Sequence, residues 1–353
     1  MVNALQEFAS AFEWRSDGSD SALDAGCGPG DITSDILSPF LPSNYKRLVG
    51  VDISKEMIGY ARETVANPKL SFEEFDLSRN LEDQKFANSE PFDHLFSFYT
   101  LMWVSDQKTC MRNFNKLLRP GGNMLLIFLG NHPVYDVYQE QSKNIKWAEY
   151  MTDVNQLISP YHSSEDPAKQ LQTLLSECGF GKADIRIHNK TYHHTYESMS
   201  SIMISVNPFV DRIPAEHRQT YVDDFIQLFA KKCLVDETVM DIDRSRFVLR
   251  YQLIVAHAKK KYNFEMITDR GMTHFSVKKS FGSTDCSLFE LNSQLCDNLG
   301  DIIYALRARA MHLFIPQMSV VVFDYSQLSG DWPTHTIKTT TVAHHFNKKQ
   351  SCK

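Results

Sequence analysis

The chain has 353 residues, 42% of them hydrophobic and 23% charged, which is typical of a globular protein with one large or two modest domains. Its net charge of −6 provides no basic field that would attract nucleic acid or an anionic membrane. The sequence contains no apolar run of the ~20 residues that span a bilayer, and its start lacks the pattern of a signal peptide. The seven cysteines form no C-x-x-C pair, so neither a zinc site nor a disulfide framework is indicated. We expect a cytoplasmic protein with reduced thiols.

Strands and helices alternate through the first part of the chain. Short apolar runs predict buried strands, and apolar residues at helical spacing predict the segments between them. The predicted strands cover residues 21–25, 47–53, 70–77, 91–99 and 123–129, and the predicted helices cover 4–14, 31–37, 107–118 and a segment that begins at Ser54. This alternation predicts an α/β, Rossmann-like fold with a mostly parallel twisted sheet and helices on both faces. In such sheets, ligands bind at the carboxyl ends of the strands.

The pattern is less regular after Gly130. Helices are predicted over 133–149 and 167–178, a strand over 183–192, mostly helix over 196–234, and a final strong strand over 247–258. The aromatic and methionine-rich helices of 196–229 are candidates for a substrate cap, although ordinary core packing explains any single residue equally well. We expect one domain over 1–260 and a C-terminal extension of unknown structure over 261–353, which includes an apolar stretch at 318–323.

A glycine-rich turn follows the first strand, with the sequence Asp24-Ala25-Gly26-Cys27-Gly28-Pro29-Gly30. Glycine lets the backbone come close to a ligand, and the helix that follows offers free N–H groups to an anion. A dinucleotide site has the spacing G-x-G-x-x-G, whereas here the third glycine comes one residue early. A ligand with a carboxylate and an ammonium group, such as S-adenosylmethionine, fits this turn better than a nicotinamide dinucleotide. The small Cys27 fits close packing and has no predicted nucleophilic role.

Polar residues also end the next predicted strands. Asp52 is placed to accept hydrogen bonds from ribose hydroxyls, and Asp76 from an amine such as that of adenine. Ser97 falls at the end of the fourth strand. The alternative for both acids is a carboxylate on a solvated loop. The pair His193-His194 is a poor metal site, because adjacent residues of a strand face opposite sides.

Several segments carry a resemblance to a known family. They are LVGVDIS at 48–54, FDHLFSFYTLMWV at 92–104, RPGG at 119–122, NHPVYDVY at 131–138 and ISP at 158–160. With the glycine turn and the acids, the chain resembles class I S-adenosylmethionine-dependent methyltransferases. Over about residues 5–258 it resembles, more narrowly, the insect juvenile hormone acid methyltransferases.

The resemblance implies methyl transfer from S-adenosylmethionine to the carboxylate of a small apolar acid such as juvenile hormone acid or farnesoic acid. The glycines would shape the methionine pocket, Asp52 would hold the ribose, and Asp76 with Leu77 would hold the adenine. The cofactor-binding residues implied are Asp24, Gly26, Gly28, Gly30, Asp52, Ile53, Met57, Asp76, Leu77, Ser97 and Phe98. The substrate-binding residues implied are Tyr99, Met102 and Trp103, whose indole N–H would donate to the carboxylate.

Two departures from the family pattern leave alternatives open. Family members carry a glutamine on a further N-terminal helix that no position of this sequence matches, and they have histidine where this chain has Met102. The alternatives are another small acid such as a fatty acid, or a paralogue that binds the cofactor without turnover. A carboxylic acid is ionised at neutral pH, so we expect no general base and no metal. The sequence leaves the oligomeric state open, a homodimer included.

Overall fold

The computed structural model describes residues 1–233, 246–262, 264–269, 272–277 and 288–291. The chain divides into two units, Met1–Lys261 and Tyr262–Lys353. In the described part of the second unit, β8 (Phe264–Asp269), β9 (Met272–Val277) and β10 (Leu288–Leu291) form an antiparallel sheet in the order β10-β9-β8. The apolar stretch 318–323 lies outside the described residues.

The first unit is built on a seven-stranded sheet with the order β3-β2-β1-β4-β5-β7-β6. β3, β2, β1, β4 and β5 pair in parallel, while β7 pairs antiparallel with both β5 and β6, so the sheet is mostly parallel, as the alternation predicted. The strands are β1 (Ser21–Ala25), β2 (Arg47–Asp52), β3 (Leu70–Glu74), β4 (Phe92–Phe98), β5 (Leu118–Leu129), β6 (Asp184–Thr195) and β7 (Arg246–Lys259). This is the Rossmann-like fold expected of a class I methyltransferase.

Helices cover both faces of this sheet. They are α1 (Val2–Glu7), α2 (Ser38–Phe40), α3 (Lys55–Thr64), α4 (Gln107–Leu117), α5 (Pro133–Gln141), α6 (Pro167–Glu177), α7 (Tyr196–Ser205) and α8 (Arg218–Cys233). Short 3₁₀ turns lie at Ala9–Ala11, Leu81–Asp83, Lys85–Asn88, Leu101–Trp103, Ala148–Tyr150, Val154–Gln156, Val210–Arg212 and Ala215–His217. Side chains alternate between two cores along β5: Leu126 packs with α4 and α6 on one face, and Leu125 packs with α1 on the other.

Several predicted elements differ from the structure, among them the strand 70–77, which ends at Glu74. The expected helix 4–14 is α1 followed by a 3₁₀ turn, and the expected strand 123–129 begins earlier because Leu118 already pairs with Phe92. The helix after the glycine turn is irregular, with a π-helical stretch over Thr33–Leu37. The expected helix 133–149 ends at Gln141, since the chain then turns to bury Trp147, whose indole N–H donates to Asp224 at 2.9 Å.

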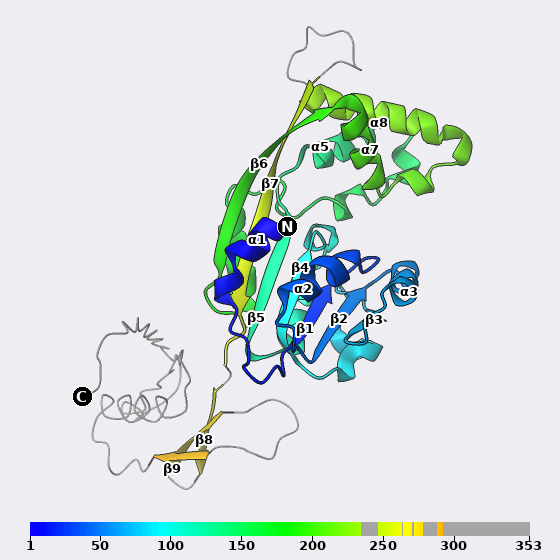
Figure 1. Cartoon of the computed structure of the whole chain (residues 1–353). Coiled ribbons are helices and arrows are strands. Elements are labelled where there is room, and N and C mark those ends of the chain that lie inside the picture. Colours follow the sequence, from blue (N-terminus) through cyan, green and yellow to red (C-terminus); the bar gives the residue numbers. More distant parts are fainter. Residues whose placement is uncertain (234–245, 263, 270–271, 278–287, 292–353) are drawn as a thin grey trace, which may run out of the picture. The chain divides into compact units, whose positions relative to one another are not determined.

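A helical cap lies beyond the carboxyl ends of the parallel strands. In Figure 1, α5, α7 and α8 lie beside the upper ends of β6 and β7. β5 leads into α5, and β6 leads directly into α7, so the cap is tied to the sheet at the edge where ligands bind in this fold. Between α7 and α8 the predicted helix 196–234 is interrupted around Pro208 and Pro214, which lack the N–H that a helix interior needs.

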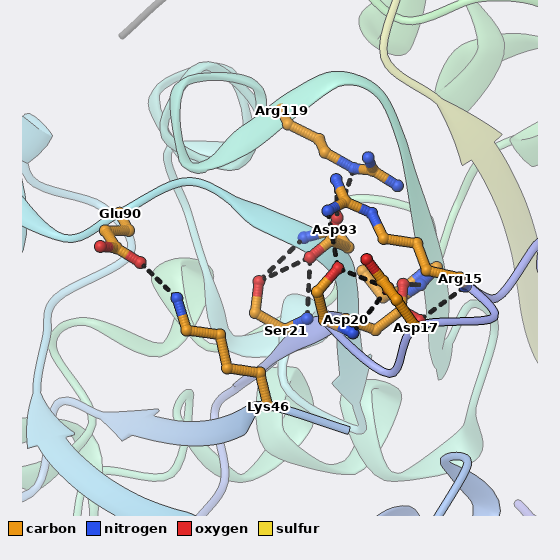
Figure 2. A network of polar contacts seen from close by, with 10 residues as sticks. Arg15, Asp17, Asp20, Ser21, Lys46, Glu90, Asp93 and Arg119 are labelled. Atoms are coloured by element: carbon orange, nitrogen blue, oxygen red, sulfur yellow. Dashed lines mark hydrogen bonds and ion pairs between the residues drawn. The ribbon is translucent and has the colours of Figure 1, made fainter. Parts of the chain in front are cut away.

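A network of ion pairs and hydrogen bonds connects the amino-terminal ends of β1 and β4. One carboxylate oxygen of Asp93 accepts both the backbone N–H and the hydroxyl of Ser21, each at 2.8 Å. The other oxygen pairs with Arg15 at 3.0 Å and with Arg119 (Figure 2). Neighbouring Asp20 accepts the N–H of Arg15 and pairs with the buried His94. Because Asp93 is buried, its charge requires these partners, and the network holds the two strands in register.

Candidate active site

The glycine turn lies at the carboxyl end of β1, and its three glycines have different surroundings. All three have positive φ angles, +84° at Gly26, +55° at Gly28 and +85° at Gly30. A Cβ at Gly26 would lie 2.1 Å from the side chain of Thr100, and one at Gly30 would lie 2.8 Å from the ring of Phe72. A Cβ at Gly28 would meet nothing within 4 Å. Two glycines are therefore required by packing, and Gly28 borders open space where a ligand can approach the backbone.

Asp52 ends β2 beside this turn. Its Oδ2 accepts the N–H of Gly28 at 3.0 Å, and its Oδ1 accepts the N–H of Ser54 at 2.9 Å. Ser54 in turn caps α3 by accepting the N–H of Met57. The side chains of Ile53 and Met57 are 65% and 44% exposed. A carboxylate with remaining acceptor capacity next to two exposed apolar side chains suits a ribose and the flat ring attached to it.

The third predicted acid, Asp76, follows β3. Its Oδ1 accepts the N–H and the hydroxyl of Ser78 at 2.8 and 2.6 Å, while its Oδ2 has no hydrogen bond within the described part of the chain. The side chain of Leu77 is buried in the core, and its carbonyl accepts from Asn113. The N–H of Leu77 makes no hydrogen bond to any described residue, so an acceptor and a donor lie adjacent and free. Such a pair matches the edge of an adenine ring.

Asp24 is the most unusual acid of the site, because it is buried without a cation. Its Oδ2 accepts the hydroxyl of Thr33 at 2.6 Å, and its Oδ1 has no partner among the described residues. Burial raises the pKa of Asp24 to about 7, and the nearby Asp52 adds to this shift. The Oδ1 of Asp24 is enclosed by the fold, so no ligand contacts it in this conformation. The residues around the glycine turn, Asp52 and Asp76 therefore fit S-adenosylmethionine at its ribose and adenine ends.

Ser97 and Phe98 are placed differently from the other predicted cofactor residues. The hydroxyl of Ser97 donates to the carbonyl of Ala25 at 2.7 Å, and the side chain of Phe98 is buried in the core. The Ser97 side chain thus stabilises the backbone just before the glycine turn. Thr100, which the sequence did not single out, has the same role, because its hydroxyl lies 3.2 Å from the carbonyl of Gly26. Thr33 was also missed, and neither threonine carries a sequence signal, since each contact joins different elements.

The predicted substrate residues follow β4. Tyr99 has a φ of +52°, unique among the described residues other than glycine, and its half-buried ring packs against both sheet cores. Strained backbone of this kind is common at functional sites. Trp103 is half-buried, and its indole N–H makes no hydrogen bond to a described residue. Met102 is buried in the core beneath them, so the structure gives its side chain little free surface.

The aromatic side chains of the predicted cap form its own core. The rings of Phe209, Tyr221, Phe225 and Phe229 are all fully buried. The exposed apolar side chains of the cap include Ile202 on α7 and Val206, which directly follows that helix. Most of the aromatic residues therefore hold the cap together, which is the packing alternative that the sequence left open.

Other features of the described residues add no competing chemistry. Burial raises the pKa of the Cys27 thiol, which keeps it protonated. Within the described ranges there is no cluster of three metal-ligating side chains, and His193 has no such partners. None of the helices in that part of the chain has the length and apolar character needed to cross a membrane.

Comparison with known proteins decides the family. A model described as a methyltransferase domain matches residues 16–191. The juvenile hormone acid O-methyltransferase of Bombyx mori is 36% identical over 264 residues, which cover 73% of this chain and 91% of that protein. The chain belongs to the juvenile hormone acid O-methyltransferase family. The Drosophila melanogaster protein of the same name is also 36% identical, over 74% of this chain and 87% of its own length.

This juvenile hormone acid O-methyltransferase family member is an S-adenosylmethionine-dependent methyltransferase. A solved structure of a methyltransferase from Bacillus halodurans C-125 aligns with a TM-score of 0.49 and 17% identity, over 74% of this chain and 98% of that one. The family model and the two insect relatives confirm the resemblance drawn from the glycine turn and the segments 92–104 and 131–138.

Proposed function

We propose that the chain methylates the carboxylate of a small apolar acid of the juvenile hormone acid or farnesoic acid type. The proposal is supported by its two relatives of that activity and by one feature of the site. The indole N–H of Trp103 is without a partner among described residues, at the carboxyl end of the strand beside the cofactor turn. A free donor at this position suits the carboxylate of an acceptor.

The reaction needs orientation more than proton transfer. S-Adenosylmethionine supplies an electrophilic methyl group on a positively charged sulfur. The acid is already a carboxylate at neutral pH, so no side chain has to remove a proton. Aligning two bound reactants contributes about 7–11 kcal/mol in favourable cases. Opposite charges combine as methyl transfer proceeds, so an apolar cap that excludes water favours the step.

The assignment of the cofactor residues is part of the same proposal. Asp52, with Ile53 and Met57, would bind the ribose and one face of the adenine. Asp76 and the N–H of Leu77 would bind the adenine edge. Gly26, Gly28 and Gly30 would shape the pocket between them. Asp24, Ser97 and Phe98 would contribute through the position of the turn, not through exposed polar side-chain atoms.

The deciding experiment is a methyl-transfer assay with labelled S-adenosylmethionine and the purified full chain. Farnesoic acid, juvenile hormone acid and lauric acid would be compared as acceptors. We expect methyl esters from the sesquiterpenoid acids at higher kcat/KM than from lauric acid. Esterification of lauric acid alone would refute the substrate class. Cofactor binding in calorimetry with no turnover of any acid would refute the activity.

A matched pair of variants tests the role of Trp103. Trp103→Phe keeps a ring and removes the N–H, so we expect KM for farnesoic acid to rise about tenfold, as for a lost hydrogen bond to a charged group. Trp14→Phe is the control, because that indole packs against Phe12 and His94, outside the cap. An equal change in both variants would assign Trp103 to packing alone.

A further inference from the structure

A histidine that the predicted site did not include lies between the sheet and the cap. His132 follows the end of β5 and precedes α5, and it is buried with 4% of its surface exposed. Its Nδ1 accepts the N–H of Val134 at 3.1 Å and thereby caps the helix. A neutral imidazole with an accepting Nδ1 carries its proton on Nε2. The ring is therefore held as an Nε2–H donor.

This donor is not used by the protein. Nε2 of His132 makes no hydrogen bond to any described residue. The fold does not fully enclose this nitrogen, whereas it does enclose the nearby Tyr135 Oη, which also lacks a partner. The Nε2–H is therefore an unused donor on an almost buried ring.

Aromatic rings from the sheet and from the cap pack around the imidazole of His132. The ring of Tyr251, on β7, lies 5.3 Å from that of His132, and the ring of Phe229, on α8, lies 6.4 Å away in a stacked arrangement. Tyr99 is close enough to Tyr251 to help raise the pKa of that phenol, although burial is the larger cause. His132 and Tyr99 follow the neighbouring strands β5 and β4, and the N–H of Tyr99 bonds the carbonyl of Ile127 at 2.7 Å. The free imidazole edge thus belongs to the same end of the sheet as Tyr99 and Trp103.

We propose that His132 binds the carboxylate of the acceptor acid through its Nε2–H and thereby selects acids over alcohols of the same carbon skeleton. This inference rests on the proposed function. One carboxylate oxygen accepts the imidazole and indole donors, and the other attacks the sulfonium methyl group. A new O–CH₃ bond forms as the S–CH₃ bond breaks, the electron pair of that bond stays on sulfur, and no proton moves. His132 supplies at this edge a donor that Met102 cannot supply.

The charge state of the ring suits this role. Burial, with a smaller contribution from His162, lowers the pKa of His132 to about 4. His162, the residue that adds to this shift, lies with its Nε2 3.2 Å from Oδ1 of Asp136. At neutral pH the ring is an uncharged donor. It orients the carboxylate and withdraws less electron density from it than an imidazolium ion would.

Two substitutions distinguish the role of Nδ1, which caps the helix, from the role of the Nε2–H donor. His132→Asn places an amide oxygen near Nδ1, so it keeps an acceptor for Val134 and is a favoured N-cap, but it removes the Nε2–H. His132→Gln is the matched control, because its amide N–H₂ reaches toward the Nε2 position while the cap is lost. Binding of farnesoic acid and of the corresponding alcohol, farnesol, would be measured by calorimetry on the full chain saturated with S-adenosylhomocysteine.

We expect His132→Asn to weaken farnesoic acid binding about 10- to 100-fold, the effect of losing a hydrogen bond to a charged group. Farnesol binding and the melting temperature should change little. His132→Gln should keep most of the affinity for the acid and melt at a lower temperature.

The outcomes distinguish the inference from the proposed function. Unchanged acid binding in His132→Asn, or an equal loss of acid and alcohol binding, would overturn the role of His132 while wild-type turnover stands. If the wild-type chain neither binds nor methylates a sesquiterpenoid acid, the proposed function fails and this inference fails with it. If the wild-type chain binds the acid without methylating it, the comparison of acid binding between wild type and His132→Asn still tests whether His132 binds the carboxylate.

Discussion

Gly28 differs from its two neighbouring glycines in having room beside its backbone. Its positive φ of +55° is accessible to other residues at a cost of about 1–2 kcal/mol, so conformation alone does not exclude a side chain. In the folded chain no atom of any residue beyond its two chain neighbours lies within 4 Å of the position that a Cβ would take there. If the space is that of the cofactor, a methyl group at Gly28 should affect binding more than folding.

We therefore expect Gly28→Ala to lower affinity for S-adenosylmethionine at least about tenfold, with a loss of stability of about 1–2 kcal/mol. Gly59→Ala in α3 is the control, because that site is equally open and has no positive φ. It should stabilise the helix by about 0.8–1 kcal/mol and leave affinity unchanged. Calorimetry and urea unfolding measure both quantities. Equal affinities of the two variants would show that the space beside Gly28 is not used.

Asp24 makes the stability of the ligand-free protein depend on pH. Its pKa is about 7 in the folded chain, against about 3.9 for an unperturbed Asp. Between these values the folded state binds more protons than the unfolded state, so the free energy of unfolding falls as pH rises from about 4 to about 7 and this contribution is then constant. Below about pH 4 both states are protonated and Asp24 adds no pH dependence.

We expect Asp24→Asn to remove this contribution, which is on the order of 2 kcal/mol between about pH 5 and pH 8. Asn retains an acceptor for the hydroxyl of Thr33, so the fold should persist. Urea unfolding of both proteins at the two pH values provides the measurement. The same pH dependence in wild type and variant would show that Asp24 is ionised in the folded chain.

The cap has a core of its own, separate from the two cores of the sheet. Phe225 of α8 is fully buried and stacks on Tyr138 of α5, with ring centroids 5.8 Å apart. Its contacts belong to the cluster that joins α5, α8 and the turn around Trp147. The glycine turn and Asp52 are held by contacts among β1, β2, β4 and α3. Cap and cofactor site are therefore expected to respond separately to mutation.

Phe225→Ala should cost about 3–5 kcal/mol within the cap, as for other large buried aromatic residues. We expect affinity for S-adenosylmethionine to stay within about threefold of wild type, an equilibrium difference below about 1 kcal/mol, while binding of farnesoic acid is strongly weakened. Hydrogen exchange should show faster opening of α8. Ile145→Ala is the control, because Ile145 is 93% exposed in the same region. Loss of cofactor binding in Phe225→Ala would show that the two sites fold as one.

The last strand of the first unit, β7, and the residues that follow it are bonded to other elements of that unit. β7 pairs with β5 and with β6, and Lys260 donates its amino group to the carbonyls of Asn115 and Leu118 at 2.6 and 2.7 Å. The N–H of Lys261 bonds Gly179. We propose that residues 1–261 fold as an independent domain, close to the expected boundary at 260.

A chain that ends at Lys261 should keep the cofactor affinity of the full chain and melt as a single transition. A chain that ends at Cys233 lacks β7, which leaves β5 and β6 without their shared partner, and should not fold. Thermal unfolding and calorimetry provide the measurements. Loss of cofactor binding on removal of 262–353 would show that the second unit supports the site.

The predictable part of this protein is local in sequence. Strands β1 to β4, the glycine turn and the acids Asp52 and Asp76 are encoded within short segments, where apolar runs end in turn residues. The helix boundaries after Gly130 were less predictable, because burial of Trp147 ends one helix early and the regions of Pro208 and Pro214 divide another.

The sequence by itself determined the parallel strands, the glycine turn and the family, since each rests on residues that are neighbours along the chain. Tertiary structure alone decided that Asp24 is enclosed with Thr33, that Thr100 packs on Gly26, and that the Nε2–H of His132 is free. These features depend on burial and on contacts between separate elements. Burial sets the protonation of a carboxyl or an imidazole, and a sequence pattern does not contain it.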